Sequence, residues 1–158
     1  SKLSEMFSSY FDLVLCDAPY SGEGMFRKYD EAISEWSEDN VRLCANRQTE
    51  ILNNLAPTVK AGGYLLYSTC TYSLEENEMV IGDFLSKREA FELVSVADEL
   101  IKQTRDGIAF DGAKNENLRF TRRFYPHVSK GEGQFIALMK RRDGEAKKQT
   151  CTRCYLEK

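Results

Sequence analysis

A cysteine and an aspartate, each directly after a short apolar run, are the residues best placed to do chemistry. Cys70 follows GYLLYST at 63–69, and Asp17 follows FDLVLC at 11–16. A cysteine thiolate is a nucleophile, and a carboxylate can accept a hydrogen bond from a ribose, an amine or a protonated ring nitrogen. The alternative interpretations are a small core residue for Cys70 and a turn cap for Asp17.

The two apolar runs have the length and composition of buried strands, with helices predicted between and after them. Ser37 is expected to cap a helix that ends near Ala56, and Ser73 with Glu76 has the form of a capping box. A helix beginning there would favour the thiolate form of Cys70 through its dipole. The other predictions are strands at 91–97 and 133–141, weak alternation at 118–124, a loop over 102–117 and a turn at 61–63.

This order of strands and helices is typical of an α/β protein with a parallel sheet and helices on its faces. In such sheets ligands bind beyond the carboxyl ends of the strands. The segments DAPYSGEG (17–24) and STCTYS (68–73) both begin at such ends, so we expect them to form one site. Pro19 would fix a turn there, while Gly22 and Gly24 let the backbone approach a ligand closely.

The composition fits one domain or part of a larger one, with 158 residues, 42% hydrophobic and 30% charged. The net charge is only −3, yet residues 119–158 carry 11 Lys and Arg against 4 Asp and Glu. A basic final segment permits a surface that faces nucleic acid, and a solvated tail is the other interpretation.

The five cysteines, an odd number at irregular spacing, indicate a reduced, cytoplasmic protein. No stretch has the length or composition of a secretory signal or a membrane span. Cys151 and Cys154 have CxxC spacing, but without a second pair we predict no metal site.

Three ordered blocks resemble the RNA 5-methylcytosine methyltransferases of the NOL1/NOP2/Sun family, whose bacterial members modify ribosomal or transfer RNA. They are FDLVLCDAPYSGEGMFRK, GGYLLYSTCTYSLEENE and RRFYPHVSKGEGQFIALMKR. The resemblance implies that residues 1–142 are the C-terminal portion of a Rossmann-like class I methyltransferase domain. In the parent domain a seven-stranded sheet carries helices on both faces. Residues 143–158 would be a tail or a linker to a further domain. The chain would need the N-terminal half of its catalytic domain, which binds most of the cofactor, and would be inactive alone.

The resemblance also implies a reaction with S-adenosylmethionine as cofactor and RNA as substrate. Cys70 would attack C6 of cytosine so that C5 can accept a methyl group, and Asp17 would stabilise a protonated N3. The same resemblance places Asp17, Ala18 and Pro19 at the cofactor. The RNA contacts that it implies are Tyr20, Ser21, Gly22, Gly24, Arg27, Lys28, Arg123 and His127.

Tyr20 departs from the family pattern, which reads Asp-Ala-Pro-Cys and uses that cysteine to release the enzyme–RNA adduct. With Tyr20 we expect the adduct to form and its turnover to change. The letters DAPY also resemble the Asp-Pro-Pro-Tyr motif of methyltransferases that act on exocyclic amino groups, where the aromatic ring stacks on the base. That activity is one alternative, and a non-catalytic RNA-binding fragment is another.

Overall fold

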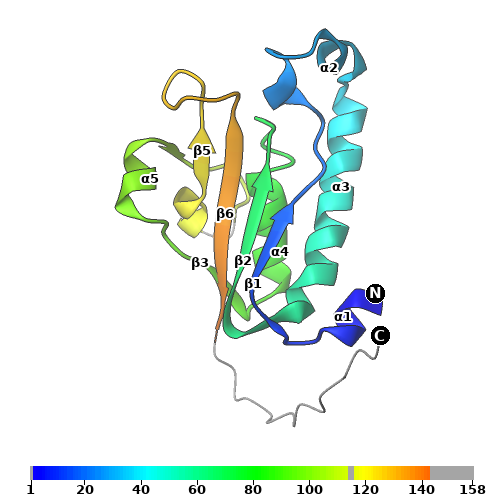
Figure 1. Ribbon diagram of the computed structural model, residues 1–158, viewed down its shortest axis with the longest axis vertical. Helices are drawn as coiled ribbons and strands as arrows, with labels where there is room; N and C mark the ends of the chain where they lie inside the picture. The colour runs from blue at the N-terminus through cyan, green and yellow to red at the C-terminus, as the bar shows by residue number, and fades with distance from the viewer. Residues whose placement is uncertain (1, 114–115, 143–158) are drawn as a thin grey trace, which may run out of the picture.

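A mixed six-stranded sheet forms the centre of the computed structural model, which describes residues 2–113 and 116–142 (Figure 1). The strand order is β1-β2-β6-β5-β4, and β3 also pairs with β6. The strands are β1 (Phe11–Asp17), β2 (Val59–Thr69), β3 (Phe91–Leu93), β4 (Arg105–Asp106), β5 (Arg122–Phe124) and β6 (Gln134–Arg141). The helices are α1 (Lys2–Met6), η1 (Glu23–Met25), α2 (Asp30–Glu35), α3 (Glu38–Leu55), η2 (Ala56–Thr58), α4 (Glu78–Lys87), α5 (Asp98–Lys102) and η3 (Glu116–Phe120).

The α/β class is confirmed, but the prediction of a parallel sheet is wrong. Among the strand pairs of the described residues only β1 and β2 run parallel, and β6 is antiparallel to β2, β3 and β5. A helical crossover through α3 returns the chain to the same end of the sheet, as a parallel pair requires. The chain instead passes from β5 to β6 through a loop at 125–133, which reverses its direction.

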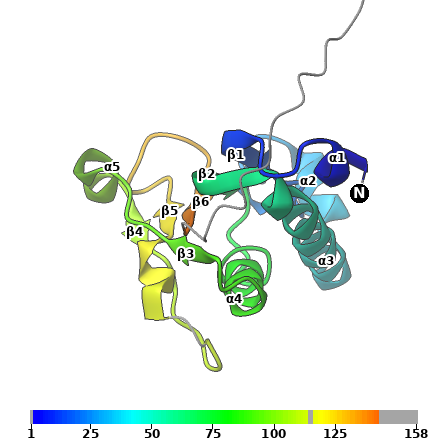
Figure 2. The same cartoon turned by 90° about the horizontal axis from the view of Figure 1, so that it is seen from below.

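The two longest helices, α3 and α4, pack on the same face of the sheet (Figure 2). Helix α3 begins as predicted, because the Ser37 hydroxyl accepts a hydrogen bond from the Asn40 N–H at 3.1 Å. The core beneath the helices is built from alternate residues of the strands and one face of each helix. Its buried members include Val14, Cys16, Leu52, Leu65, Tyr67, Val80, Ile81, Phe84, Phe135, Ala137 and Met139.

Strand β2 begins earlier than predicted, so residues 61–63 lie within a strand and are not a turn. The register with β1 shifts between Phe11 and Leu13, and Gly62 has a φ of 76°. A Cβ on Gly63 would lie 2.9 Å from the Asp12 carbonyl oxygen. The glycines therefore allow an irregular, close approach of two strands, the other common role of glycine in a sheet.

The later elements are shorter than the sequence indicated. Strand β3 covers only the first part of the predicted 91–97, and the segment 118–124 divides into η3 and β5. The predicted loop at 102–117 is interrupted by β4, which pairs with β5. Residues 143–158, with the predicted tail and the pair Cys151 and Cys154, lie outside the described residues.

The opposite face of β1 is apolar and uncovered. Leu13 and Leu15 are 59% and 63% exposed, while the alternate residues Val14 and Cys16 are buried against the helices. Within residues 2–113 and 116–142, β1 pairs only with β2, so its other edge is free. In that same part of the chain, no helix has the length and apolar character to cross a membrane.

Candidate active site

Two loops meet at the carboxyl ends of β1 and β2, as the sequence predicted. We call residues 17–25 the first loop and residues 70–77 the second loop. The Gly24 N–H donates to the Cys70 carbonyl at 2.9 Å, and the Ser68 hydroxyl donates to Asp17 Oδ1 at 2.8 Å. A Cβ on Gly24 would overlap the Cys70 carbonyl group, so this contact requires glycine.

Cys70 is half-buried, as is Tyr20 in the first loop, and the Tyr20 hydroxyl affects the pKa of the Cys70 thiol. Burial raises the pKa of this thiol above 9.0, the Tyr20 hydroxyl lowers it, and the charges of Asp17 and Glu132 raise it. The thiol form therefore predominates at neutral pH. Cys16 differs because it lies in the core, where burial raises its pKa to about 11.

The prediction that a helix start favours the Cys70 thiolate is wrong. Helix α4 begins only at Glu78, after turns at 74–77, and the pKa of Cys70 is raised and not lowered. Half of the predicted capping box is present, since the Glu76 N–H donates to Ser73 Oγ at 3.2 Å. The second bond of a capping box, from the Ser73 N–H to the Glu76 carboxylate, is not formed. The carboxylate accepts from the Ser21 N–H at 3.0 Å and from Gln48 Nε2 at 2.8 Å.

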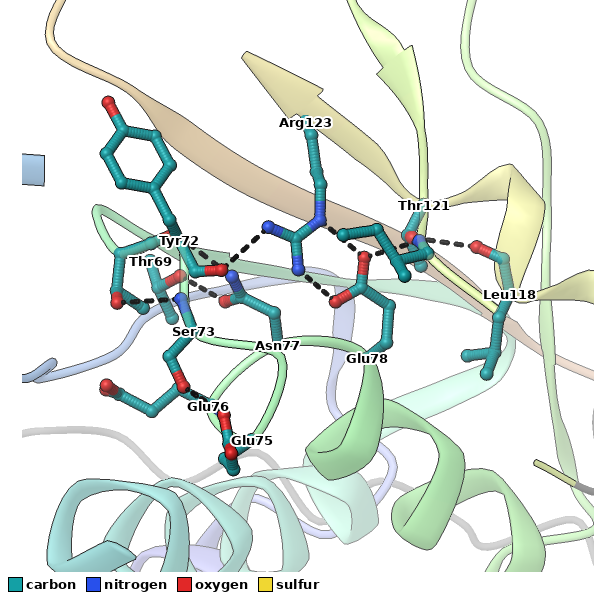
Figure 3. A network of polar contacts seen from close by, with 12 residues as sticks. Thr69, Tyr72, Ser73, Glu75, Glu76, Asn77, Glu78, Leu118, Thr121 and Arg123 are labelled. Atoms are coloured by element: carbon teal, nitrogen blue, oxygen red, sulfur yellow. Dashed lines mark hydrogen bonds and ion pairs between the residues drawn. The ribbon is translucent and has the colours of Figure 1, made fainter. Parts of the chain in front are cut away.

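The second loop is held by a buried polar network (Figure 3). The Thr69 hydroxyl donates to Asn77 Oδ1 at 2.6 Å, and Asn77 Nδ2 donates to the Thr71 carbonyl at 3.0 Å. Thr69, Glu76 and Asn77 each have 0% exposure. The backbone on both sides of Cys70 is therefore fixed by side chains that water does not reach.

Arg123 belongs to this network, so its predicted role as an RNA contact is wrong. Its guanidinium forms a bidentate ion pair with Glu78, and the two side chains are 2% and 0% exposed. Arg123 Nη1 also donates to the Tyr72 carbonyl at 2.9 Å. Arg123 thus ties β5 to α4 and to the segment after Cys70 (Figure 3), and it does not face solvent.

Glu23 is a site residue that sequence reasoning missed. Its Oε2 accepts from the Thr71 hydroxyl at 3.1 Å and from the Tyr72 N–H at 3.0 Å, and its Oε1 accepts from Trp36 Nε1 at 3.1 Å. The only signal was an acidic residue between Gly22 and Gly24. Glu23 therefore joins the first loop to the second through partners other than those of Glu76.

The other predicted residues fall into a backbone group and a surface group. The Ala18 N–H donates to the Ser68 carbonyl at 2.9 Å, and the Pro19 carbonyl accepts from Gln48 Nε2 at 2.8 Å. Ser21 is buried, and Gly22 takes a φ of 107° at the start of η1. At the surface, Lys28 lies 4.0 Å from Glu132. Arg27 and His127 line an open pocket of about 520 Å³ with Tyr72, Tyr125 and Pro126.

Comparison with known proteins identifies the family of the chain. Residues 1–140 match the family model described as 16S rRNA methyltransferase RsmB/F. The chain belongs to the RsmB/F family. The solved structure of a methyltransferase homolog protein from Pyrococcus horikoshii superposes on 88% of the chain with a TM-score of 0.68 and 29% identity, using 41% of its own length. NSun6 from the same organism, solved with SFG, superposes on 80% of the chain with a TM-score of 0.57 and 26% identity, using 29% of its length.

Curated relatives of this RsmB/F chain include rRNA methyltransferases from mouse and from bacteria. A mouse 28S rRNA (cytosine-C(5))-methyltransferase is 37% identical over 137 residues, which is 83% of this chain and 17% of the relative. Ribosomal RNA small subunit methyltransferase F of Aeromonas hydrophila is 35% identical over 132 residues, 83% of this chain and 26% of the relative. The chain thus spans about a quarter or less of these proteins.

Proposed function

We propose that the chain is the C-terminal portion of the catalytic domain of an S-adenosylmethionine-dependent enzyme that methylates C5 of cytosine in ribosomal RNA. The observation that carries the proposal is the half-buried Cys70 thiol directly after β2, next to the β1 strand end where Asp17 pairs with Ser68 and accepts its hydroxyl hydrogen bond. The names of the mouse and bacterial relatives support ribosomal RNA as the substrate class.

In this proposal Cys70 Sγ forms a bond to C6 of the cytosine, and the ring electrons move to C5. Asp17 stabilises the proton on N3 of the ring. S-adenosylmethionine, when bound, supplies the methyl group that C5 accepts. Loss of the C5 proton then returns the electrons to the ring as the Sγ–C6 bond breaks. Because the pKa of Cys70 is raised, the attack should become faster as pH rises and the thiolate fraction grows.

The cofactor would need residues beyond those described here. Asp17, Ala18 and Pro19 form one side of a strand-end site, which fits the edge of a cofactor pocket but not a whole pocket. The free edge of β1 and the exposed Leu13 and Leu15 are surfaces that a folded protein normally covers. We propose that the preceding half of the catalytic domain covers them and completes the cofactor site. A reducing cytoplasm would keep Cys70 as a free thiol.

The product of the complete enzyme tests this proposal. The enzyme is incubated with S-adenosylmethionine and ribosomal RNA, and the digested nucleosides are separated by mass spectrometry. We expect new 5-methylcytosine, and none after Cys70→Ser. A methyl group on the exocyclic amine would instead support the function suggested by the DAPY letters. RNA binding without any methyl product would support a non-catalytic RNA-binding protein.

The isolated chain provides a second test. If the cofactor site needs the preceding half-domain, calorimetric titration of the 158-residue chain with S-adenosylmethionine should give no binding heat. Micromolar binding would contradict the need for that half.

A further inference from the structure

Three aromatic rings from two distant segments form a continuous stack. The Tyr72 and Tyr125 ring centroids are 5.9 Å apart with planes inclined by 19°. The Tyr125 and His127 centroids are 5.4 Å apart with planes inclined by 23°. Tyr72 lies just after Cys70 in the second loop, whereas Tyr125 and His127 follow β5. The stack therefore starts two residues after the proposed nucleophile and ends at the exposed His127.

The stack is held rigidly at its inner end. The Tyr72 hydroxyl donates to the Glu132 carbonyl, and the Tyr72 backbone is bound by Glu23 on its N–H and by Arg123 on its carbonyl. A Cβ on Gly133, which has a φ of 122°, would overlap the Tyr72 hydroxyl. Glycine at that position thus leaves room for the ring. A fixed aromatic surface loses little conformational entropy when a planar ligand stacks on it.

The outer side of the stack is open and carries a cation. The pocket of about 520 Å³ is lined by the three rings, Pro126 and the exposed Arg27. This volume lies in the range of small-ligand sites. Aromatic rings next to a guanidinium match the two parts of a nucleotide, which are a base that stacks and a phosphate that accepts hydrogen bonds. A purely structural stack would not need an open pocket or an exposed arginine.

We propose that this pocket binds the nucleotide next to the target cytosine, with its base stacked on the Tyr72–Tyr125–His127 rings and its phosphate at Arg27. The identity of the neighbour rests on the proposed function, which puts the target cytosine at Cys70. Because a base inside a duplex is already stacked on its neighbours, the substrate must be unpaired at this position. The structure thus assigns single-stranded or looped RNA as the form that the site accepts.

A fluorescent base analogue tests the stack. The complete enzyme is titrated with a short single-stranded RNA that carries 2-aminopurine next to a single cytosine. Stacking should quench the fluorescence on binding. Tyr125→Leu should weaken affinity roughly 10-fold and reduce the quenching, as expected for the loss of a stacked base. Tyr125→Phe should retain both, and Tyr64→Leu, which removes a partly exposed ring outside the stack, should match the wild type.

The exposed His127 provides a second variant that carries little risk of misfolding. His127→Ala should also reduce the quenching, with an unchanged melting temperature. Wild-type affinity and quenching in both Tyr125→Leu and His127→Ala would overturn the proposal. The methylation assay on the same preparations distinguishes a failure of the stacking proposal from a failure of the proposed methyltransferase function. Tyr125-dependent quenching without 5-methylcytosine would support the stack and contradict the methyltransferase. Methylation with quenching that does not depend on Tyr125 would support the methyltransferase function and contradict the stacking site.

Discussion

The two loops of the site are stabilised in different ways. The second loop, which carries Cys70, is anchored by its own buried side chains and by the Arg123–Glu78 pair. The first loop, which carries Asp17 and Tyr20, has few internal bonds. It is held mainly by contacts with other segments. The Ser21 N–H donates to Glu76 of the second loop, and Gln48 of α3 donates to the Pro19 carbonyl.

This difference indicates a division of roles. A nucleophile must be fixed within a narrow range of geometry, so its backbone is built into the core. The first loop can differ in sequence as long as its backbone still contacts the second loop. Tyr20 belongs to the first loop, and its hydroxyl affects the pKa of the Cys70 thiol. The position of the first loop therefore depends on that of the second loop.

The largest expected effect follows from removing the ion pair beneath the second loop. Arg123→Met should reduce the free energy of unfolding by about 3–5 kcal/mol, because the Glu78 carboxylate would remain buried without its partner. Arg42→Met is the matched control, since it removes exposed ion pairs with Glu38 and Asp39 and should cost less than about 1 kcal/mol. Chemical denaturation measures both. Equal losses would contradict the special role of the buried pair.

The contact between the loops is tested at Gly24. A Cβ there must push the first loop away from the Cys70 carbonyl, so Gly24→Ala should cost about 1–3 kcal/mol and lower activity more than stability alone explains. Gly82→Ala, in helix α4, is the control because its Cβ would meet ordinary contacts at 3.5 Å or more. That change should be neutral or stabilising. Thermal melts and a methylation assay provide the two measurements.

A smaller effect is expected from the ionisation of Glu76, which makes the free energy of unfolding depend on pH. Burial raises its pKa above 4.5, partly opposed by hydrogen bonds from Ser21 and Gln48. The folded state therefore binds the proton more tightly than the unfolded state does, and the stability from this group is lost as pH rises from about 4.5 through the raised pKa. Glu76→Gln should flatten this part of the stability–pH curve. The exposed Glu75→Gln should leave it unchanged, and an unchanged slope in Glu76→Gln would contradict the account.

The smallest expected effect concerns the influence of the Tyr20 hydroxyl on the pKa of the Cys70 thiol. Tyr20→Phe removes the interaction that lowers the pKa of the thiol, so this pKa should rise further. Alkylation of Cys70 by iodoacetamide, followed by peptide mass spectrometry over a range of pH, measures the shift. Tyr29→Phe is a control at another, exposed tyrosine. A lower pKa of Cys70 in Tyr20→Phe would show that the hydroxyl does not stabilise the thiolate.

Local sequence patterns predicted the elements whose signals are local. Strand β1, strand β6 and helix α3 were expected from apolar runs, periodicity and the Ser37 cap, and all three are present. The meeting of the two loops also followed from the rule for strand ends. The direction of β6 did not follow, because it depends on how the chain connects β5 to β6.

The missed features depend on contacts between distant residues. Arg123 was taken for a surface cation because its partner Glu78 lies 45 residues away in sequence. The start of α4 was misplaced because the Glu76 side chain bonds to Ser21 and Gln48 and does not complete the capping box. Tyr72 and Tyr125 carry no motif that marks them as partners, so only the fold brings their rings together.

The most direct test of the central claim is to trap the covalent adduct. The complete enzyme is incubated with S-adenosylmethionine and RNA that contains 5-fluorocytosine, from which the C5 substituent cannot leave as a proton. Mass spectrometry of the digested complex then locates the attached nucleotide. We predict attachment at Cys70 and none in Cys70→Ser. Attachment at Cys16 or Cys44, an adduct that persists in Cys70→Ser, or no adduct at all would contradict the account.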